Sequence, residues 1–296
     1  MDLTSAKTIK ELLLKHHTHP SKTMGQNFLI DKNILQKIIE AADISVKDTV
    51  IEIGPGIGTL TQKLAKKAKK VIAIEKDQTM VDIATETLRE YKNIEVLQGD
   101  ILKMTNGQTP MANKNQRSKI GNWDLGIKDY KVVANIPYYI TSPIIRMFLE
   151  VNNQPAQIIL TIQKEVAQRI CAAPPNMSIL AVSVQYYATA QIISYVSRAC
   201  FWPSPNVDSA IIKITPVKKA KSNTKKPFKE SDSDLFFKIV KAGFSHPRKQ
   251  LANNLSKELK KSREEASEWL IKNNLNPLQR AETLSVQDWI NLVNNF

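Results

Sequence analysis

Three glycines spaced two residues apart form the most distinctive chemical feature of the chain. Gly54, Gly56 and Gly58 follow an apolar run that contains a single acid, Glu52, and a helical apolar pattern comes next. This order predicts a strand, a tight turn and a helix. Glycines suit such a turn because the backbone bends sharply and a ligand has to approach the main chain closely. The stretch 49–60 therefore predicts a small-molecule site at the end of a strand.

Two further acids stand at the ends of the next two predicted strands. Glu75 ends the second strand, where a carboxylate can accept hydrogen bonds from both hydroxyls of a ribose. Asp100 follows the third strand and suits the exocyclic amine of adenine. A dinucleotide fingerprint would need glycine where Thr59 stands. The glycine pattern resembles instead the first motif of methyltransferases that use S-adenosylmethionine (SAM), which we expect as the cofactor.

The fourth predicted strand runs into Asn135, Ile136, Pro137 and Tyr138, a motif that can act on an exocyclic amine. Adenine N6 is a poor nucleophile because its lone pair is delocalised into the ring. We expect the Asn135 side-chain oxygen and the Ile136 carbonyl to accept hydrogen bonds from its N–H groups and so to free the lone pair. Pro137 would fix the turn that directs this carbonyl outward, and Tyr138 would stack on an extruded base. These four residues are the predicted catalytic group.

Residues 20–31 lie just upstream of the helix that leads into the first strand. They contain Lys22 and a Gly-Gln-Asn trio that precedes an apolar Phe-Leu-Ile. We expect this segment to fold back over the cofactor. A simpler interpretation is a helix start, with Asp31 capping residues 32–42, and the two interpretations are compatible.

The composition favours a polyanionic partner. The 296 residues carry a formal net charge of +14, with a pI of about 9.6. We see no secretory or lipidation signal, and no apolar run of the roughly 20 residues that span a membrane. Cys171 and Cys200 lie in no metal or redox spacing, and the cluster of His16, His17 and His19 lacks further ligands. We therefore expect no metal, no membrane and a reducing cytoplasm.

The length fits one large domain followed by a small one. Strands that would complete a seven-stranded sheet, the last two as an antiparallel pair, are expected at 156–162, 182–193 and 209–215. We expect residues 1–217 to form this α/β domain, 218–231 a basic linker and 232–296 a helical domain. The polar stretch 103–130 predicts a long loop.

These motifs and several others occur in a fixed order along the chain. They are Gly25 to Leu29, Glu52 to Gly58, Glu75, Gly99-Asp100, Asn135 to Tyr138, Gln163 to Ala167, Phe201 to Ser209 and Phe244 to Leu255. Together they resemble the ribosomal RNA adenine dimethyltransferase family, in its small-subunit (KsgA-type) branch. The resemblance implies a class I SAM-dependent methyltransferase fold, Rossmann-like, with a small C-terminal α-helical domain. It also implies N6,N6-dimethylation of two adjacent adenines in the 3′-terminal hairpin of 16S rRNA.

The resemblance further implies roles for single residues. Those expected to bind SAM are Asn27, Leu29, Gly54, Glu75, Asp100 and Asn135. Those expected to contact RNA are Lys22, Phe201, Arg248 and Lys249. Phe201 would cover the second face of the extruded base. The expected substrate is 16S rRNA within the assembling small subunit, and the expected enzyme is a monomer with a role in subunit biogenesis.

Three other functions compete with this one. A 23S rRNA adenine methylase of the macrolide-resistance type shares the motifs, but as a family lacks a clear counterpart of residues 244–255. A non-catalytic RNA-binding assembly factor would keep the fold, although the complete catalytic motif argues against it. A DNA adenine methylase would need a target-recognition domain. The chain departs from the family at Thr23-Met24 and Ser178-Ile179, which concerns the RNA contacts more than the chemistry.

Overall fold

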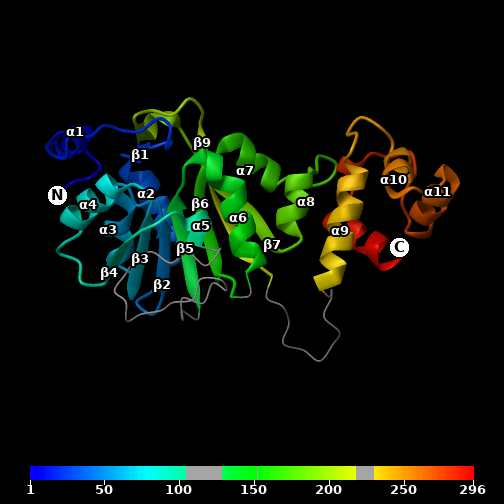
Figure 1. Cartoon of the computed structure of the whole chain (residues 1–296), viewed down its shortest axis with the longest axis horizontal. Coiled ribbons are helices and arrows are strands. Elements are labelled where there is room, and N and C mark those ends of the chain that lie inside the picture. Colours follow the sequence, from blue (N-terminus) through cyan, green and yellow to red (C-terminus); the bar gives the residue numbers. More distant parts are fainter. Residues whose placement is uncertain (105–128, 152, 218–229) are drawn as a thin grey trace. The chain divides into compact units, whose positions relative to one another are not determined.

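The computed structural model describes residues 1–104, 129–151, 153–217 and 230–296. Its centre is a seven-stranded sheet in the order β4-β3-β2-β5-β6-β9-β7 (Figure 1). The strands are β2 Thr49–Ile53, β3 Lys70–Glu75, β4 Ile94–Gln98, β5 Tyr130–Asn135, β6 Gln157–Gln163, β7 Ala188–Val196 and β9 Ser209–Pro216. The first five strands of this order pair in parallel, and β9 runs antiparallel to β6. The predicted class I methyltransferase sheet is thus confirmed.

Helices pack on this sheet and connect its strands. They are α1 Ala6–Lys15, α2 Lys32–Ala42, α3 Thr59–Ala65, α4 Gln78–Thr87, α5 Ile101–Met104, α6 Thr141–Glu150 and α7 Lys164–Ile170, with the short 3-10 turns η1 Tyr138–Ile140 and η2 Arg198–Cys200. The buried side chains of α2, Leu35 among them, share a core with Val133 of β5 and Ile159 of β6. Asp31 caps α2 as predicted, because its Oδ1 accepts the N–H groups of Asn33 and Ile34.

A second, two-stranded ribbon joins segments that lie far apart in the sequence. Strand β1, Phe28–Leu29, pairs antiparallel with β8, Phe201–Trp202. The rings of Phe28 and Trp202 stack with their centroids 6.5 Å apart. Phe28 also packs in a small core with the buried face of α1. The ribbon therefore holds the 20–31 segment beside the loop that precedes β9.

The chain divides into two compact units. One contains residues 1–167 and 190–216, and the other contains residues 168–189 and 217–296. The second unit is helical: its helices are α8 Ile179–Gln185, α9 Glu230–Gly243, α10 Leu251–Leu259, α11 Arg263–Lys272 and α12 Val286–Asn294, with the 3-10 turn η3 Ala281–Thr283. Phe236 of α9 and Trp289 of α12 are fully buried in its core.

The strand predicted at 182–193 is partly wrong, because residues 179–185 form helix α8 and β7 begins only at Ala188. Ser178 caps this helix by accepting the N–H of Ala181. Ala181 and Val182 are buried in the same core as Phe236 and Trp289. Residues 168–189, expected in the α/β domain, cluster for this reason with the helices.

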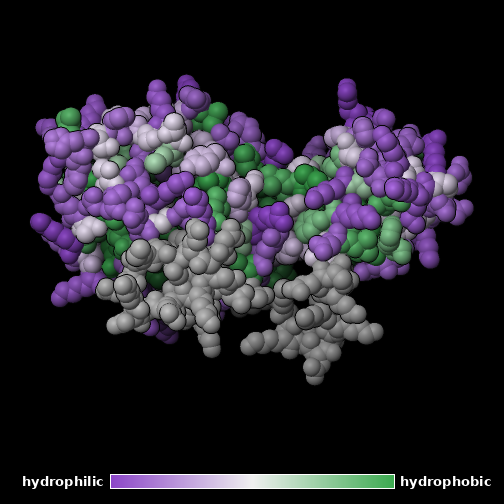
Figure 2. Space-filling view, in the orientation of Figure 1, coloured by the Kyte–Doolittle hydropathy of each residue, from purple (hydrophilic) through white to green (hydrophobic). Residues whose placement is uncertain are grey.

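Two expectations fall on parts of the chain outside the described residues. They concern most of the 103–130 loop and nearly all of the basic linker at 218–231. Within the described ranges, no helix combines the length and the hydropathy needed to cross a bilayer. Polar side chains cover most of the face seen in Figure 2.

Candidate active site

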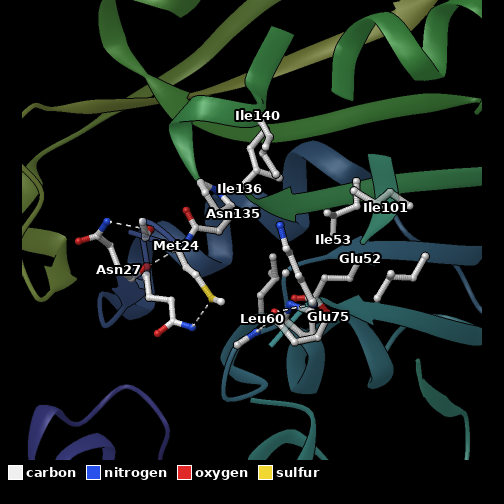
Figure 3. Close-up of a pocket in the computed structure, with 18 of the residues that line it drawn as sticks. Met24, Asn27, Glu52, Ile53, Leu60, Glu75, Ile101, Asn135, Ile136 and Ile140 are labelled. Carbon is white, nitrogen blue, oxygen red and sulfur yellow. Dashed lines mark hydrogen bonds between the residues drawn. The ribbon is translucent and has the colours of Figure 1, made fainter. Parts of the chain in front are cut away.

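A pocket opens at the carboxyl ends of β2, β3, β4 and β5, and its volume is about 160 Å³. It collects ten of the predicted site residues, from six separate segments of the chain, and Figure 3 labels four of them. These are Asn27, Leu29, Gly54, Glu75, Asp100, Asn135, Ile136, Pro137, Tyr138 and Phe201. Lys22 is exposed and is not among the lining residues, whereas Arg248 and Lys249 belong to the helical unit and are also exposed.

The glycine turn gives a ligand direct access to the backbone. Gly54 has a φ of +66°, in the left-handed region that favours glycine, and its N–H is bonded to the Ile74 carbonyl at 2.9 Å. A Cβ built on Gly54 would meet no atom of the described residues within 4 Å, so it would project into open pocket space. The turn is therefore shaped for a ligand that lies against the main chain at Gly54.

Glu75 is held rigidly at the end of β3. Its side chain is nearly buried, and its carboxylate accepts the N–H groups of Gly56 at 3.1 Å, Lys76 at 2.8 Å and Asp77 at 3.0 Å. Burial raises the pKa of Glu75 despite these hydrogen bonds. Each carboxylate oxygen has two acceptor positions, so the group can take further hydrogen bonds from a ribose. This geometry suits the predicted role of Glu75.

Asp100 lies at the neighbouring strand end. Its Oδ1 accepts the Leu102 N–H at 3.1 Å, and its Oδ2 forms an ion pair with Nζ of Lys76 at 3.0 Å. Carboxylate oxygens retain acceptor positions for an adenine amine beside these partners. The sequence analysis did not identify Lys76, which also lines the pocket. In the sequence, only the position of Lys76 directly after Glu75 indicates that it belongs to the site. Its pairing with Asp100 depends on the register of β3 and β4, which the sequence does not show.

Glu52 lies beneath the glycine turn and is 1% exposed. Its Oε2 has no hydrogen-bond partner among the described residues. Burial raises the pKa of Glu52 to about 8, and the nearby charge of Glu75 acts in the same direction. Burial thus favours the protonated, neutral form of Glu52, a property that its position in a strand does not reveal.

The N-terminal segment lines the pocket with residues 24–29, and it comes close to the rest of the site at three places. Nδ2 of Asn135 donates to the Asn27 carbonyl at 3.1 Å. Nε2 of Gln26 donates to Oδ2 of Asp77 at 2.9 Å. Gly25 has a φ of +63°, and a Cβ built there would lie 3.3 Å from Cβ of Pro137. The 20–31 segment and the turn at 135–138 are thus in close contact (Figure 3).

The aromatic side of the pocket contains Tyr138 and Phe201. The Tyr138 hydroxyl forms a 2.7 Å hydrogen bond with Oγ of Ser209, and burial raises the pKa of Tyr138. Phe201 is 3% exposed, since it pairs with Leu29 in the two-stranded ribbon. A flat base that enters the pocket meets an aromatic ring whose position is fixed by a hydrogen bond.

Of the three clustered histidines, His16 takes part in a contact between α1 and α4. Nε2 of His16 lies 3.0 Å from Oε2 of Glu86, and Nζ of Lys15 lies 2.6 Å from Oε1 of the same carboxylate. Across the part of the chain that the structure describes, no group of three or more His, Cys, Asp or Glu side chains is arranged to hold a metal ion.

Comparisons with known proteins identify the family of the chain. The family model for ribosomal RNA adenine dimethylase matches residues 18–296. The chain is 42% identical over 305 residues to ribosomal RNA small subunit methyltransferase A of Streptococcus thermophilus, covering 99% of this chain and 97% of the relative. It is 38% identical over 298 residues to the protein of that name from Geobacillus thermodenitrificans, covering 99% and 96%.

Two solved structures have the same fold. A dimethyladenosine transferase from Plasmodium falciparum superposes with a TM-score of 0.68 at 27% identity, covering 88% of this chain and 94% of that one. The 23S rRNA methyltransferase ErmE gives a TM-score of 0.69 at 24% identity, covering 91% and 99%. The match over nearly the whole chain, together with the motifs that meet in the pocket, shows that this chain belongs to the ribosomal RNA adenine dimethylase family.

Proposed function

We propose that the protein is a SAM-dependent 16S rRNA adenine N6,N6-dimethyltransferase. It transfers methyl groups to two adjacent adenines in the 3′-terminal hairpin loop of the small ribosomal subunit. The observation that carries this proposal is the meeting of Asn135 and Tyr138 with Gly54, Glu75 and Asp100 in one pocket. Relatives at 38–42% identity are named ribosomal RNA small subunit methyltransferase A, which supports the small subunit as the substrate.

The residues present fit SAM. The open space at Gly54 would take the methionine part, Glu75 the ribose hydroxyls and Asp100 the adenine amine, with Asn27 and Leu29 as the cover. SAM, when bound, supplies an electrophilic methyl group on a sulfonium. The residues of the chain would hold this group in the pocket that Asn135 also lines, and the 20–31 segment would limit the access of water.

The chain's own groups prepare the target amine. Oδ1 of Asn135 and the carbonyl of Ile136 accept hydrogen bonds from the two N–H groups of adenine N6. These hydrogen bonds draw the nitrogen toward tetrahedral geometry. Pro137, with φ −56° and ψ 135°, sets the direction of the turn. Tyr138 stacks on the base, and Phe201 covers its second face. No strong base is required, because the methylated product cation loses its proton readily; positioning supplies the rate.

The second methyl transfer onto each adenine has a different requirement. A monomethylated amine has only one N–H bond left, so one of the two acceptors loses its partner. We propose that Asn135 keeps this remaining hydrogen bond, because its amide is fixed by the Asn27 carbonyl. The four transfers would then use one orientation of Asn135.

The decisive experiment is tritiated methyl transfer from SAM to small subunits that lack the two dimethyladenines, followed by primer-extension mapping. Wild-type protein should label the two adjacent adenines of the 3′-terminal hairpin, and Asn135→Ala should not. Label confined to 23S rRNA would move the protein to the resistance type. SAM binding with no transfer to any ribosomal RNA would favour the assembly-factor function.

The cellular setting follows from this substrate. We propose that the protein works in the cytoplasm as a monomer on the assembling small subunit. The net charge of +14 favours association with ribosomal RNA. Lys22, Arg248 and Lys249 are exposed cations that are proposed to contact phosphates.

A further inference from the structure

An exposed tyrosine and a lysine lie together at the pocket edge of the sheet, outside the pocket itself. Nζ of Lys164 is 5.4 Å from the centroid of the Tyr195 ring. Although Lys164 lies near its ring, the Tyr195 residue is 52% exposed. Neither residue lines the pocket that contains Asn135. A half-exposed ring with an adjacent cation is a common combination for binding single-stranded nucleic acid.

The sheet register fixes how this pair relates to the catalytic turn. Tyr138 is hydrogen-bonded to Ser209, the first residue of β9, and Ser209 is paired with Gln163, the last residue of β6. Lys164 follows directly, and its N–H is bonded to the Asp208 carbonyl at 3.0 Å. Tyr195 is the penultimate residue of β7, which is the neighbour of β9. Lys164 therefore lies at the start of β9 beside Ser209, and its cation–π contact brings Tyr195 to the same end of the sheet.

The two faces of β7 differ in what they contact. Ser194 accepts a hydrogen bond from Nζ of Lys37 in α2 at 3.2 Å, and Val196 is buried in the core beneath α2. Gln191, Ile193 and Tyr195 alternate with these residues and are exposed. The tyrosine ring therefore projects from the sheet face opposite α2, where a ligand can reach it.

We propose that Tyr195 and Lys164 bind a nucleotide that flanks the target adenine. This inference rests on the proposed function, since a base extruded into the pocket stays joined to neighbours that must cross its rim. The flanking base stacks on the exposed part of the Tyr195 ring, and Nζ of Lys164 donates to a phosphate beside it. Arg198, also exposed two residues after β7, adds positive charge to the same rim.

Kinetics on under-methylated small subunits test this subsite. Tyr195→Ala should raise the KM for subunits about tenfold, with an unchanged SAM Kd, because stacking on one base is lost. Tyr195→Phe keeps the ring and should restore most of the affinity, whereas Tyr195→Leu keeps apolar bulk without a ring and should not. Lys164→Gln should lower the salt dependence of subunit binding by about one unit of log–log slope. Gln191→Ala, on the same exposed face, is the matched control and should match wild type.

Crosslinking then identifies the partner. Small subunits with a photoreactive nucleotide on either side of the target adenines are irradiated with the enzyme, and the crosslinked peptide is identified by mass spectrometry. A crosslink to the β7 peptide supports the proposal. Crosslinks found only to peptides that contain neither Tyr195 nor Lys164, a wild-type KM for Tyr195→Ala, or a full rescue by Tyr195→Leu would overturn it. If wild-type protein labels no small-subunit RNA at all, the proposed function fails instead, which is a separate outcome.

Discussion

The Asn135 amide donates through Nδ2 to the backbone carbonyl of Asn27, at 3.1 Å (Figure 3). An amide has its donors on nitrogen and its acceptor on oxygen, so this bond leaves Oδ1 as the atom that can accept from a substrate amine. The acceptor that the chemistry needs is thus oriented by the N-terminal cover. If Asn135 has the proposed role, residues 20–31 orient its acceptor as well as lining the pocket.

Two substitutions of Asn135 separate its acceptor from its donor. Asn135→Ala removes both and should lower kcat by at least about 100-fold, in line with the loss of one preorganised hydrogen-bonding group. Asn135→Asp keeps an acceptor but loses the donor to Asn27, and the kcat of this variant should also fall strongly. Single-turnover methyl transfer measures both, with the thermal unfolding midpoint as the check on folding. A kcat near wild type for Asn135→Asp would show that the contact with Asn27 does not orient the group.

Gly25 tests the contact between the cover and the catalytic turn. Gly25→Ala places a side chain at φ +63° and within 3.3 Å of Cβ of Pro137. Left-handed backbone costs an ordinary residue about 1–2 kcal/mol, so the segment should shift away from Pro137. We expect kcat/KM for methyl transfer to fall about tenfold. Lys47→Ala, at an exposed position outside this segment, should have no effect, and equal losses in both variants would contradict the assignment.

Glu75→Gln should weaken SAM binding. The wild-type carboxylate accepts three backbone N–H groups, and an amide would turn its own N–H groups toward some of these donors. Hydrogen bonds to charged groups are worth about 1.5–3 kcal/mol, so the SAM Kd should rise about 10- to 100-fold. Calorimetric titration with SAM measures this, and Glu90→Gln, which is exposed, is the control. An unchanged Kd would show that the ribose is held elsewhere.

Much of this architecture could be predicted, because it depends on short-range patterns. The strand, turn and helix at 49–60 follow from an apolar run and glycines that the backbone requires, and Gly54 has the expected positive φ. Parallel strands bring their carboxyl ends to one edge, so Glu75, Asp100 and Asn135 had to meet once the strands were identified. The pocket confirms this.

Other features depend on contacts that spacing does not encode. Alternating residues after Val182 indicated a strand, but a Ser178 cap and burial in the helical core select a helix for residues 179–185. The pair formed by Gln26 and Asp77 joins residues 51 positions apart. Likewise the ionisation of Glu52 depends on burial in three dimensions, which a single acid in an apolar strand does not reveal.

Gly243, the last residue of α9, is expected to tolerate no side chain. A Cβ built there would overlap Cη2 of the buried Trp289 and lie 3.0 Å from its Cζ3. Gly→Ala in a helix is ordinarily favourable by about 0.5–1 kcal/mol, so the sign of the effect is informative. We expect Gly243→Ala to lower the free energy of unfolding by about 1–3 kcal/mol, measured by urea denaturation. Lys241→Ala on the exposed face should be neutral, and a stabilised Gly243→Ala would disprove the packing.

Glu52 should make the stability of the protein fall as the pH rises. The pKa of Glu52 is about 8 in the folded protein, whereas an unperturbed glutamate, as in the unfolded chain, has a pKa of 4.5. Below about pH 4.5 the carboxyl is protonated in both the folded and the unfolded state, so it does not change the free energy of unfolding with pH. Between these values the folded state keeps a proton that the unfolded chain has lost, and the free energy of unfolding declines by about 1.4 kcal/mol per pH unit from this group.

Glu52→Gln removes that dependence without a large change in volume. Its stability relative to wild type should therefore increase steadily between about pH 5 and pH 8 and level off above. Urea denaturation of both proteins across this range measures the difference, in which the other titrating groups cancel. Glu90→Gln, an exposed acid, should give a flat difference. A flat difference for Glu52→Gln as well would mean that the buried carboxyl titrates normally, which its 1% exposure argues against.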